Sequence, residues 1–486
     1  MGMDTIIRGG TIVTASDQYI ADIGVEGGVI TTIGRDLLAA TGGPPQGGQA
    51  EGRVTRPSGR GPQVIDATGT YVLPGAIDAH VHLDMPFGGT VTADDYRTGT
   101  IAAACGGVTT VVDYCLQSVG GTLAAALETW QAKGAGKAVI DYGLHIAVTD
   151  LTPAVMAELP AVVKAGVSSI KCFMAYKGVF QIADDTLFQL LEQARELGAL
   201  VNVHAENGDV IDVLIKRYVA AGMLSPWYHR ASRPPEVEGE ATGRAIALAE
   251  LAHAPLNIVH VTCQEAVEKI QAGREKGLPV YGETCPQYLL LNEEQYHEDD
   301  FEGFGGAKYV MSPPLRAKRN NDILWRALAQ GDLQTLMTDH CAFRMRDQKT
   351  LGRDNFAKIP NGAPGIETRL PLIYSEGVGH GRLSLQHMVA LLCTNAARMY
   401  GLYPRKGTIA VGSDADLVLL DPHKRVTLSA STLNQDTDYT PFEGVQCKGY
   451  PVLTLSRGEV IAVDGAYVGA QGRGQFLRRG PHMPLS

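Results

Sequence analysis

The sequence contains no C-x-x-C pair, although its 486 residues include eight cysteines. Scattered cysteines in a long chain form neither a disulfide framework nor a zinc ribbon, and they are typical of a reducing compartment. The first residues, MGMDTIIRGGTIV, have no charged stretch followed by an apolar one, and no run of about 18 apolar residues occurs in the chain. We therefore expect a cytoplasmic protein with no membrane partner.

Basic charge is also scarce. The chain has 42 Lys and Arg against 52 Asp and Glu, a net charge of −10, and no basic stripe or aromatic RNA-binding motif offsets it. We therefore expect no nucleic-acid partner. The motifs G-x-S-x-G and H-E-x-x-H are absent as well, which removes the usual signals of a serine hydrolase and of a zincin protease.

The middle of the chain alternates short apolar segments with amphipathic ones. Residues 185–198 and 263–277, for example, place apolar side chains at the i, i+3, i+4 spacing of a helix. This repeat predicts an α/β fold, a (β/α)₈ TIM-like barrel over residues 74–400, whose chemistry would lie at the C-terminal ends of its strands. A doubly wound open sheet is the alternative, but no G-x-G-x-x-G fingerprint supports it. The expected strands lie within residues 109–115, 142–150, 168–175, 199–206, 256–262, 278–285 and 335–340.

Both ends of the chain are rich in β-branched residues with Gly-Gly, Gly-Ser-Asp and Asp-Gly turns. Neither end alone has enough strands for a stable sheet. We therefore predict one small β-sandwich domain, built from residues 1–73 and from residues 401–486 with their tail. Residues 41–63 are dominated by Gly and Pro and predict a mobile surface loop.

Potential metal ligands end several of the predicted strands. His80 and His82 are two residues apart, which places both imidazoles on one face of a strand. His204, His260 and Asp339 each lie at or near the end of another apolar run. Each alone could fill a core or cap a helix, but five such residues on one barrel rim indicate a site for zinc or a similar divalent ion.

Lys171 lies in the middle of the buried segment SSIKCFMAYKG. Desolvation would depress the pKa of its ammonium, and a neutral amine that reacts with carbon dioxide could bridge two metals through the resulting carboxylate. The alternative is an ordinary ion pair with Asp339 or Asp84.

As a set, several motifs resemble the dihydropyrimidinase and D-hydantoinase family of the amidohydrolase superfamily, over nearly the whole chain. They are HVHLDMPFGGT, IKCFMAYK, VNVHAENG, RPPEVEGEA, SPPLR, TDHCAF, IPNGAPGIETR and DYTPFEG. The resemblance implies a homotetramer with two zinc ions per site. It further implies a metal-dependent hydrolase that opens 5,6-dihydropyrimidines and 5-monosubstituted hydantoins, small cyclic ureides or imides, to N-carbamoyl amino acids.

The resemblance also implies a role for each candidate. One metal would take His80, His82 and Asp339, the other His204 and His260, and Lys171 would bridge them as N6-carboxylysine together with a hydroxide. Asp339 would carry the proton, Tyr176 would stabilise the oxyanion, and Ser312 and Asn361 would hold the ring. Phe87, Phe173 and Phe180 could shape the pocket. His145 also lies in a predicted strand, but the matching family strand supplies no ligand.

Two other functions remain open at this point. One is a different cyclic amidase, an allantoinase or a dihydroorotase. The other is a non-catalytic scaffold resembling the collapsin response mediator proteins, which share the fold but have lost metal ligands, whereas every ligand position is filled here.

Overall fold

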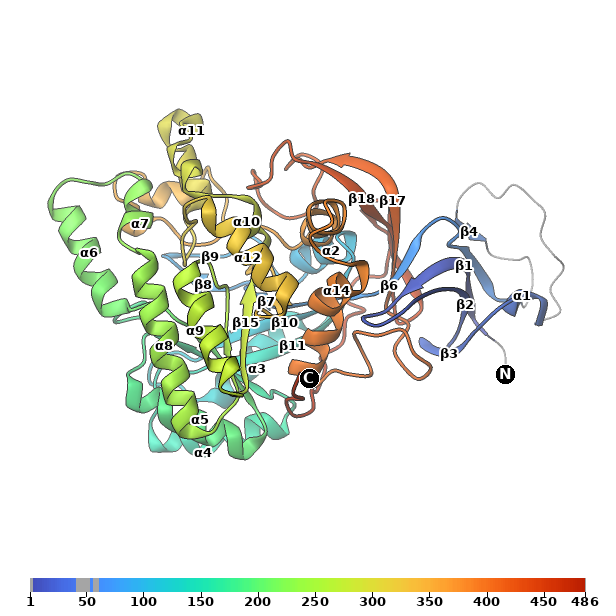
Figure 1. Ribbon diagram of the computed structural model, residues 1–486, viewed down its shortest axis with the longest axis horizontal. Helices are drawn as coiled ribbons and strands as arrows, with labels where there is room; N and C mark the ends of the chain where they lie inside the picture. Colours follow the sequence, from blue (N-terminus) through green and yellow to red (C-terminus); the bar gives the residue numbers. More distant parts are fainter. Residues whose placement is uncertain (1–2, 41–52, 56–60, 486) are drawn as a thin grey trace.

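The computed structural model describes residues 3–40, 53–55 and 61–485. Two sheets organise it: a parallel barrel with surrounding helices and a separate sheet to its right in Figure 1, into which both the blue and the red ends of the chain run. Most of the predicted mobile loop, residues 41–63, lies outside the described residues. Within its described part, β4 (Val54–Thr55) pairs with β5 (Gln63–Asp66).

Eight parallel strands form the barrel and confirm the predicted fold class. They pair in chain order, and the barrel closes through a bridge between Val81 and His340, where the His82 amide donates to the His340 carbonyl at 2.8 Å. Residues 108–116 are buried throughout, which is why the segment reads as a continuous apolar run. The strands are β7 (Ala76–Val81), β10 (Val108–Leu116), β11 (Asp141–Ala147), β12 (Ser169–Phe173), β13 (Leu200–His204), β14 (Leu256–Ile258), β15 (Val280–Thr284) and β16 (Thr335–Leu336).

Helices follow the barrel strands and cover their outer faces (Figure 1). In α5 (Asp184–Leu197) the residues Leu187, Leu190, Leu191 and Ala194 form one buried stripe, and Gly198 ends the helix in the left-handed conformation with φ 66°. The others are α2 (Thr98–Cys105), α3 (Leu123–Gly134), α4 (Pro153–Lys164), α6 (Gly208–Ala220), α7 (Trp227–Ala231), α8 (Pro235–Ala252), α9 (Gln264–Glu275), α10 (Pro286–Leu290), α11 (Asp300–Gly303), α12 (Arg319–Gln330), α13 (Arg369–Ile373), α14 (Leu385–Val389) and α15 (Asn395–Met399), with α1 (Leu37–Ala40) in the other part of the chain.

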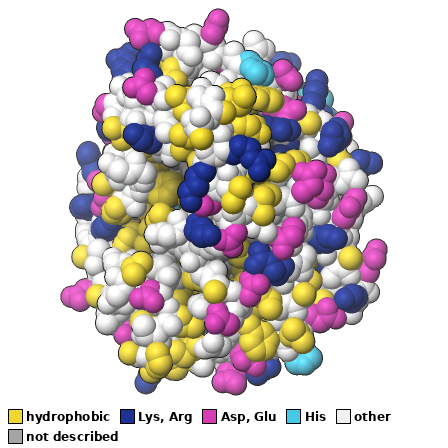
Figure 2. Space-filling view, turned by 90° about the vertical axis from the view of Figure 1, so that its left-hand side faces the viewer, with side chains coloured by type: hydrophobic (Ala, Val, Ile, Leu, Met, Phe, Trp, Pro, Cys, Tyr) yellow, Lys and Arg dark blue, Asp and Glu magenta, His cyan; other side chains and the backbone are white. Residues whose placement is uncertain are grey.

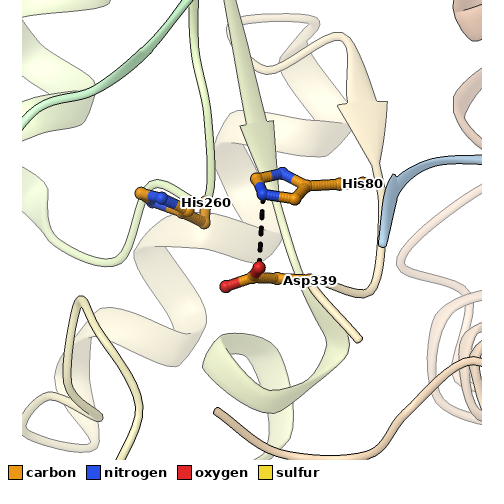
Figure 3. A group of neighbouring side chains, drawn as sticks. All are labelled: His80, His260 and Asp339. Atoms are coloured by element: carbon orange, nitrogen blue, oxygen red, sulfur yellow. Dashed lines mark ion pairs between the residues drawn. The ribbon is translucent and has the colours of Figure 1, made fainter. Parts of the chain in front are cut away.

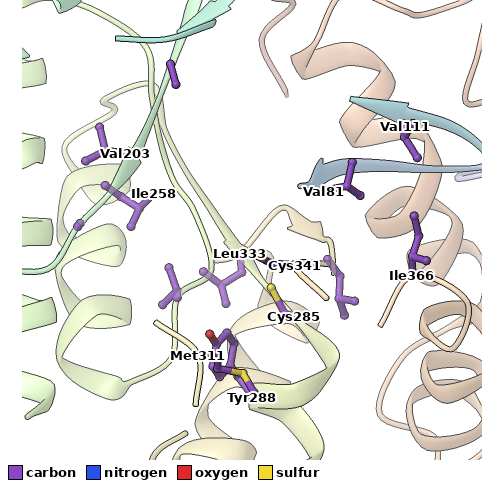
Figure 4. Close-up of a cluster of buried hydrophobic side chains, with 14 of the residues drawn as sticks. Val81, Val111, Val203, Ile258, Cys285, Tyr288, Met311, Leu333, Cys341 and Ile366 are labelled. Carbon is purple, nitrogen blue, oxygen red and sulfur yellow. The ribbon is translucent and has the colours of Figure 1, made fainter. Parts of the chain in front are cut away.

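The main hydrophobic cluster fills the space between the barrel strands and these helices. Figure 4 shows part of it, with Val81, Val203 and Ile258 on barrel strands or directly beside them and Tyr288 on α10. All eight cysteines are buried free thiols, in agreement with the expected lack of a disulfide framework. On the face that carries α6, basic and acidic side chains are interspersed with apolar ones (Figure 2). In the described part of the chain, no helix combines the length and the apolar character that a membrane span requires.

The strands from the two chain ends share one sheet, as predicted. β17 pairs with β6 antiparallel and thereby joins the two ends, and the sheet has its own buried core, which includes Ile23, Ile65 and Leu419. Its path is β20–β19–β18–β17–β6–β1–β2–β3, with β5 beside β1. The bounds are β1 (Thr5–Val13), β2 (Gln18–Glu26), β3 (Val29–Gly34), β6 (Tyr71–Pro74), β17 (Leu417–Thr427), β18 (Gln446–Ser456), β19 (Glu459–Val463) and β20 (Ala466–Tyr467).

A buried charge cluster connects this sheet to the barrel. The Lys406 ammonium lies 2.8 Å from Asp141 at the start of β11, 2.9 Å from Asp414 and 2.7 Å from Asp416 just before β17. Arg457 pairs with Asp141 as well. The junction between the two parts is therefore held by directional contacts in addition to apolar packing.

The chain beyond β20 returns to the barrel and covers its lower end, where the barrel strands begin. The Tyr142 amide donates to the Gln475 carbonyl at 2.9 Å, and the Leu477 amide donates back to Tyr142 at 2.7 Å. Arg479 is 5% exposed and donates to Ser169 Oγ at 2.8 Å and to the Leu144 carbonyl. We call residues 475–483 the barrel floor. It lies at the end of the strands opposite to the one where the candidate site residues gather.

Candidate active site

All nine candidate residues line one cavity of about 40 Å³, which we call the inner cavity. Its metal-ligand candidates are at or just beyond the C-terminal ends of barrel strands, the edge at which barrel enzymes carry their chemistry. The structure therefore brings the whole predicted set together: His80, His82, Lys171, Tyr176, His204, His260, Ser312, Asp339 and Asn361.

The two histidines of β7 face the same carboxylate. His80 Nε2 lies 3.2 Å from Asp339 Oδ1, and His82 Nε2 lies 3.1 Å from the same oxygen. Figure 3 shows the His80 ring facing Asp339, with His260 beside them. On its other side, His80 Nδ1 contacts Glu283 Oε1 at 2.5 Å, the arrangement in which a carboxylate orients a metal-binding imidazole.

His204 and His260 form the other half of the rim, with ring centroids 4.6 Å apart. His204 Nε2 contacts Glu206 Oε2 at 2.8 Å. Burial raises the pKa of the Glu206 carboxyl, but the hydrogen bond with His204 and the positive charges nearby together lower it more, so the pKa stays below its usual value and Glu206 remains ionised. The ring centroid of His260 also lies 5.4 Å from that of His80, so His260 has His204 on one side and His80 on the other.

Among the described residues, three buried imidazole nitrogens at this rim make no hydrogen bond: His80 Nε2, which has only its 3.2 Å approach to Asp339, His82 Nδ1 and His260 Nδ1. Burial lowers the pKa of all three histidines, which keeps the rings neutral and their lone pairs available. Ligand atoms of His80, His260 and Asp339 lie within 4.8 Å of one another. A buried polar atom without a partner is costly, and nitrogen and carboxylate donors at this spacing suit a divalent ion. The residues present therefore fit a metal.

Lys171 has no ion-pair partner among the described residues. Its ammonium instead lies over the rings of Tyr114, at 4.6 Å, and Phe173, at 5.1 Å. Burial lowers its pKa to about 8, although Asp339 opposes the shift, so part of the population is a neutral amine near neutral pH. The alternative of a simple ion pair does not hold, because Asp84 lies 3.8 Å from Lys133 instead.

Three of the candidate residues have left-handed backbones: Tyr176 with φ 66°, His260 with φ 43° and Asp339 with φ 52°. Such conformations cost a side chain of this size on the order of 1–3 kcal/mol each and cluster at functional sites. All three residues leave the end of a barrel strand and turn back over the cavity. The chain therefore tolerates strain at the rim in order to direct these groups inward.

Polar groups for a bound ring lie on loops above the rim. Asn361 Nδ2 donates to Ser312 Oγ at 3.3 Å, and the Tyr176 hydroxyl interacts with Ser312. Burial raises the pKa of Tyr176, which keeps its hydroxyl protonated and able to donate. The predicted phenylalanines also line the inner cavity, with Phe87 stacked on Phe180 at 5.8 Å. Phe87 belongs to the hairpin of β8 (Pro86–Phe87) and β9 (Thr90–Val91).

A larger cavity of about 550 Å³ adjoins the inner one, and Phe87, Tyr176 and Asn361 line both. The larger cavity is open, and its wall includes the buried Arg233 and Glu206. The inner cavity is therefore the narrow end of a wider approach.

Sequence reasoning missed two carboxylates that support the ligands. Glu206 lies within the quoted motif VNVHAENG, and Glu283 lies near the end of a predicted strand, where a buried acid is itself an unusual signal. Both ring nitrogens of His145 have partners, at 2.6 Å from Ser169 Oγ and 2.9 Å from the Ala79 carbonyl, and His145 does not line the inner cavity.

The fold and the residues at its rim define a barrel hydrolase with a candidate divalent-metal site. The model of the amidohydrolase family matches residues 71–461. A D-hydantoinase of Geobacillus stearothermophilus is 52% identical over 99% of this chain and 98% of the relative. The chain belongs to the amidohydrolase family, within its D-hydantoinase and dihydropyrimidinase group.

Solved structures agree with this placement. A dihydropyrimidinase from Brevibacillus agri is 51% identical, with a TM-score of 0.93 over 99% of this chain and 100% of that one. An L-hydantoinase from Arthrobacter aurescens is 31% identical, with a TM-score of 0.84 over 98% of this chain and 99% of that one. The same fold therefore serves relatives named for opposite enantiomers.

Proposed function

We propose that this enzyme opens 5,6-dihydropyrimidines and 5-monosubstituted hydantoins to N-carbamoyl amino acids. The observation that carries the proposal is the inner cavity, where unpartnered imidazole nitrogens, Asp339 and an unpaired buried Lys171 meet the polar groups of the ring-holding loops. The names of the similar proteins, which are hydantoinases and a dihydropyrimidinase, support this substrate class.

We further propose that the site holds two zinc ions. When bound, such ions polarise a carbonyl group and lower the pKa of a water molecule. The unpartnered nitrogens of His80, His82 and His260 support these ligands. Lys171 would contribute as N6-carboxylysine, because a neutral amine can add carbon dioxide and then becomes an anionic ligand. One ion would be held by His80, His82 and Asp339, the other by His204 and His260, and the carboxylated Lys171 would be a ligand for both.

The remaining steps fall to the side chains of the chain. The Asp339 carboxylate would take a proton from the attacking water and pass it to the ring nitrogen that leaves. The Tyr176 hydroxyl would donate to the oxygen on which negative charge develops. Ser312 and Asn361 would hold the edge of the ring that carries its hydrogen-bond donors and acceptors. The phenylalanines that line the inner cavity would exclude water.

A dihydroorotase would need a cationic group for the carboxylate of its substrate. Among the described residues lining the inner cavity, the only lysine or arginine is Lys171, which the proposal assigns to the metals. This disfavours dihydroorotase as the main activity. An allantoinase stays the second candidate, because Arg233 and Glu206 in the larger cavity could hydrogen-bond a polar ring substituent.

The test is a comparison of ring opening by the zinc-loaded enzyme with dihydrouracil, a 5-monosubstituted hydantoin, allantoin and dihydroorotate. We expect one of the first two to be the best substrate, and their ratio separates pyrimidine breakdown from a broader hydantoinase role. A higher kcat/KM for allantoin or dihydroorotate would contradict the proposal, as would zinc-loaded protein that opens none of the four.

The proposal also includes the division into residues 1–73, 74–400 and 401–486, a homotetramer and a cytoplasmic location. The net charge of −10 supports the expectation that nucleic acid is not a partner. Sedimentation of the purified protein would test the tetramer.

A further inference from the structure

Lys349 is a fully buried lysine outside both cavities. It begins the short helix η3 (Lys349–Gly352), and its side chain points into the protein. Its Nζ donates to three carbonyl oxygens: those of Val310 at 2.8 Å, Pro360 at 2.7 Å and Gly362 at 2.7 Å. An ammonium has three N–H groups, so the three acceptors match its donors completely.

The three carbonyls belong to the two loops that carry the proposed ring-holding residues. Val310 lies two residues before Ser312, and Pro360 and Gly362 flank Asn361. The loops also contact each other directly, since the Gly362 amide donates to Val310 at 2.9 Å. Lys349 therefore connects the two loops through their backbone carbonyls. The side chains of the same loops meet in the inner cavity, where Asn361 donates a hydrogen bond to Ser312.

Among the described residues, no ion pair accounts for the burial of the Lys349 ammonium. In the part of the chain that the structure describes, no carboxylate lies within ion-pair distance of its Nζ, and the nearest aromatic ring is that of Phe343, with a centroid 5.7 Å away. Burial lowers the pKa of Lys349, but three carbonyl acceptors at 2.7–2.8 Å favour the protonated form. Such a charge is expensive to bury, and the carbonyls are what stabilise it. A methionine of similar length would fill the same space without this cost.

We propose that Lys349 is a positioning residue, whose ammonium fixes the spacing of the Ser312 and Asn361 loops and thereby the ring-binding edge of the inner cavity. The inference rests on the proposed function, because it takes these two residues as the ring-holding groups. Groups that read a rigid ring must be held within about 0.5 Å of the productive geometry, and two loops without a common support drift apart more easily than that.

The main experiment replaces Lys349 by methionine in the zinc-loaded enzyme. We expect KM for dihydrouracil or for a 5-monosubstituted hydantoin to rise about tenfold, the loss of one or two ring hydrogen bonds, while kcat falls by less than about threefold. Zinc content should stay at the level of the unmodified enzyme. The matched control is Lys406→Met, which removes another buried lysine far from the cavity and should leave KM unchanged.

A second readout does not depend on activity. Hydrogen exchange of the amides in residues 310–313 and 359–362, compared with that of the barrel-strand amides in the same variant, should become faster in Lys349→Met but not in Lys406→Met, whose destabilisation acts on the whole protein. Unchanged exchange in both segments, or a KM within about twofold of the unmodified enzyme, would overturn the inference. An unmodified enzyme that opens neither ring would refute the proposed function, and the exchange data would still decide whether Lys349 fixes the loops. Where Lys349→Met does not fold, Lys349→Gln, which keeps two N–H donors, is used for the same measurements.

Discussion

Replacing Tyr176 by phenylalanine removes one hydroxyl group and leaves the rest of the site in place. The ring is held by aromatic neighbours, with centroids 5.6 Å from Phe87, 5.9 Å from Phe180 and 5.2 Å from His204. A phenylalanine would keep these contacts, and the cost of the left-handed backbone would be the same for either residue. The substitution therefore isolates the hydrogen bond from the packing.

The expected loss is that of one donor to a developing oxyanion, about 2.7–4 kcal/mol or roughly 10²–10³ in kcat. A water molecule that takes the place of the missing hydroxyl would not be held by the phenol ring, so it would not be preorganised to donate to the oxyanion. Because burial raises the pKa of Tyr176, its hydroxyl stays protonated on both sides of neutrality. The ratio of kcat between the two enzymes should therefore stay constant from about pH 7 to pH 9.

The assay is steady-state ring opening, with zinc content and thermal unfolding measured on the same samples. Tyr450→Phe is the matched control, since Tyr450 is a buried tyrosine of β18 in the other sheet. The control should keep its full kcat. If Tyr176→Phe turns over within about twofold of the unmodified enzyme, Tyr176 does not stabilise the oxyanion and the reasoning is refuted.

Other predictions concern the metals and the domain junction. Lys171→Met should fold normally, within about 1 kcal/mol of the metal-free parent, because it removes an unpaired buried charge, but elemental analysis should find its metal content greatly reduced. Chelation should abolish ring opening, and zinc added with bicarbonate should restore it; recovery with zinc alone under carbon dioxide-free conditions would contradict a carboxylated Lys171. Lys406→Met should lower the free energy of unfolding by about 3–5 kcal/mol in denaturant titrations, because Asp416 loses its only ion-pair partner among the described residues and Asp141 keeps only Arg457; an unchanged midpoint would contradict this. Burial lowers the pKa of Lys406 but its aspartate neighbours raise it more, so this stabilisation is complete at neutral pH and is lost only as the pH rises through the raised value.

Most of the barrel could be predicted from the sequence because each strand is buried on both faces. Such strands read as largely apolar runs, of nine residues in β10 and five in β12, and a charged residue within one, such as Lys171, is conspicuous. The H-x-H pair was equally visible, since alternation in a strand places His80 and His82 on one face. The joining of the two chain ends into one sheet followed from the strand count at each end.

The supporting groups could not be predicted in the same way. Lys349 acts on backbone carbonyls, which every residue has, so no side-chain pattern marks its partners. Glu283 lies on β15 and is 203 residues from His80 in the chain, so only closure of the barrel places its carboxylate beside the His80 ring. Arg479 lies in a segment without regular secondary structure, and its contact with Ser169 joins residues far apart in the chain.

The barrel floor has a consequence for how the protein is made. Arg479 and Leu477 complete this end of the barrel roughly 140 residues after β16 ends at Leu336. At about 5–20 residues per second, this delay during synthesis is on the order of ten seconds. Until then Ser169 on β12 lacks the hydrogen bond from Arg479, and the apolar residues that pack on Leu477 stay uncovered.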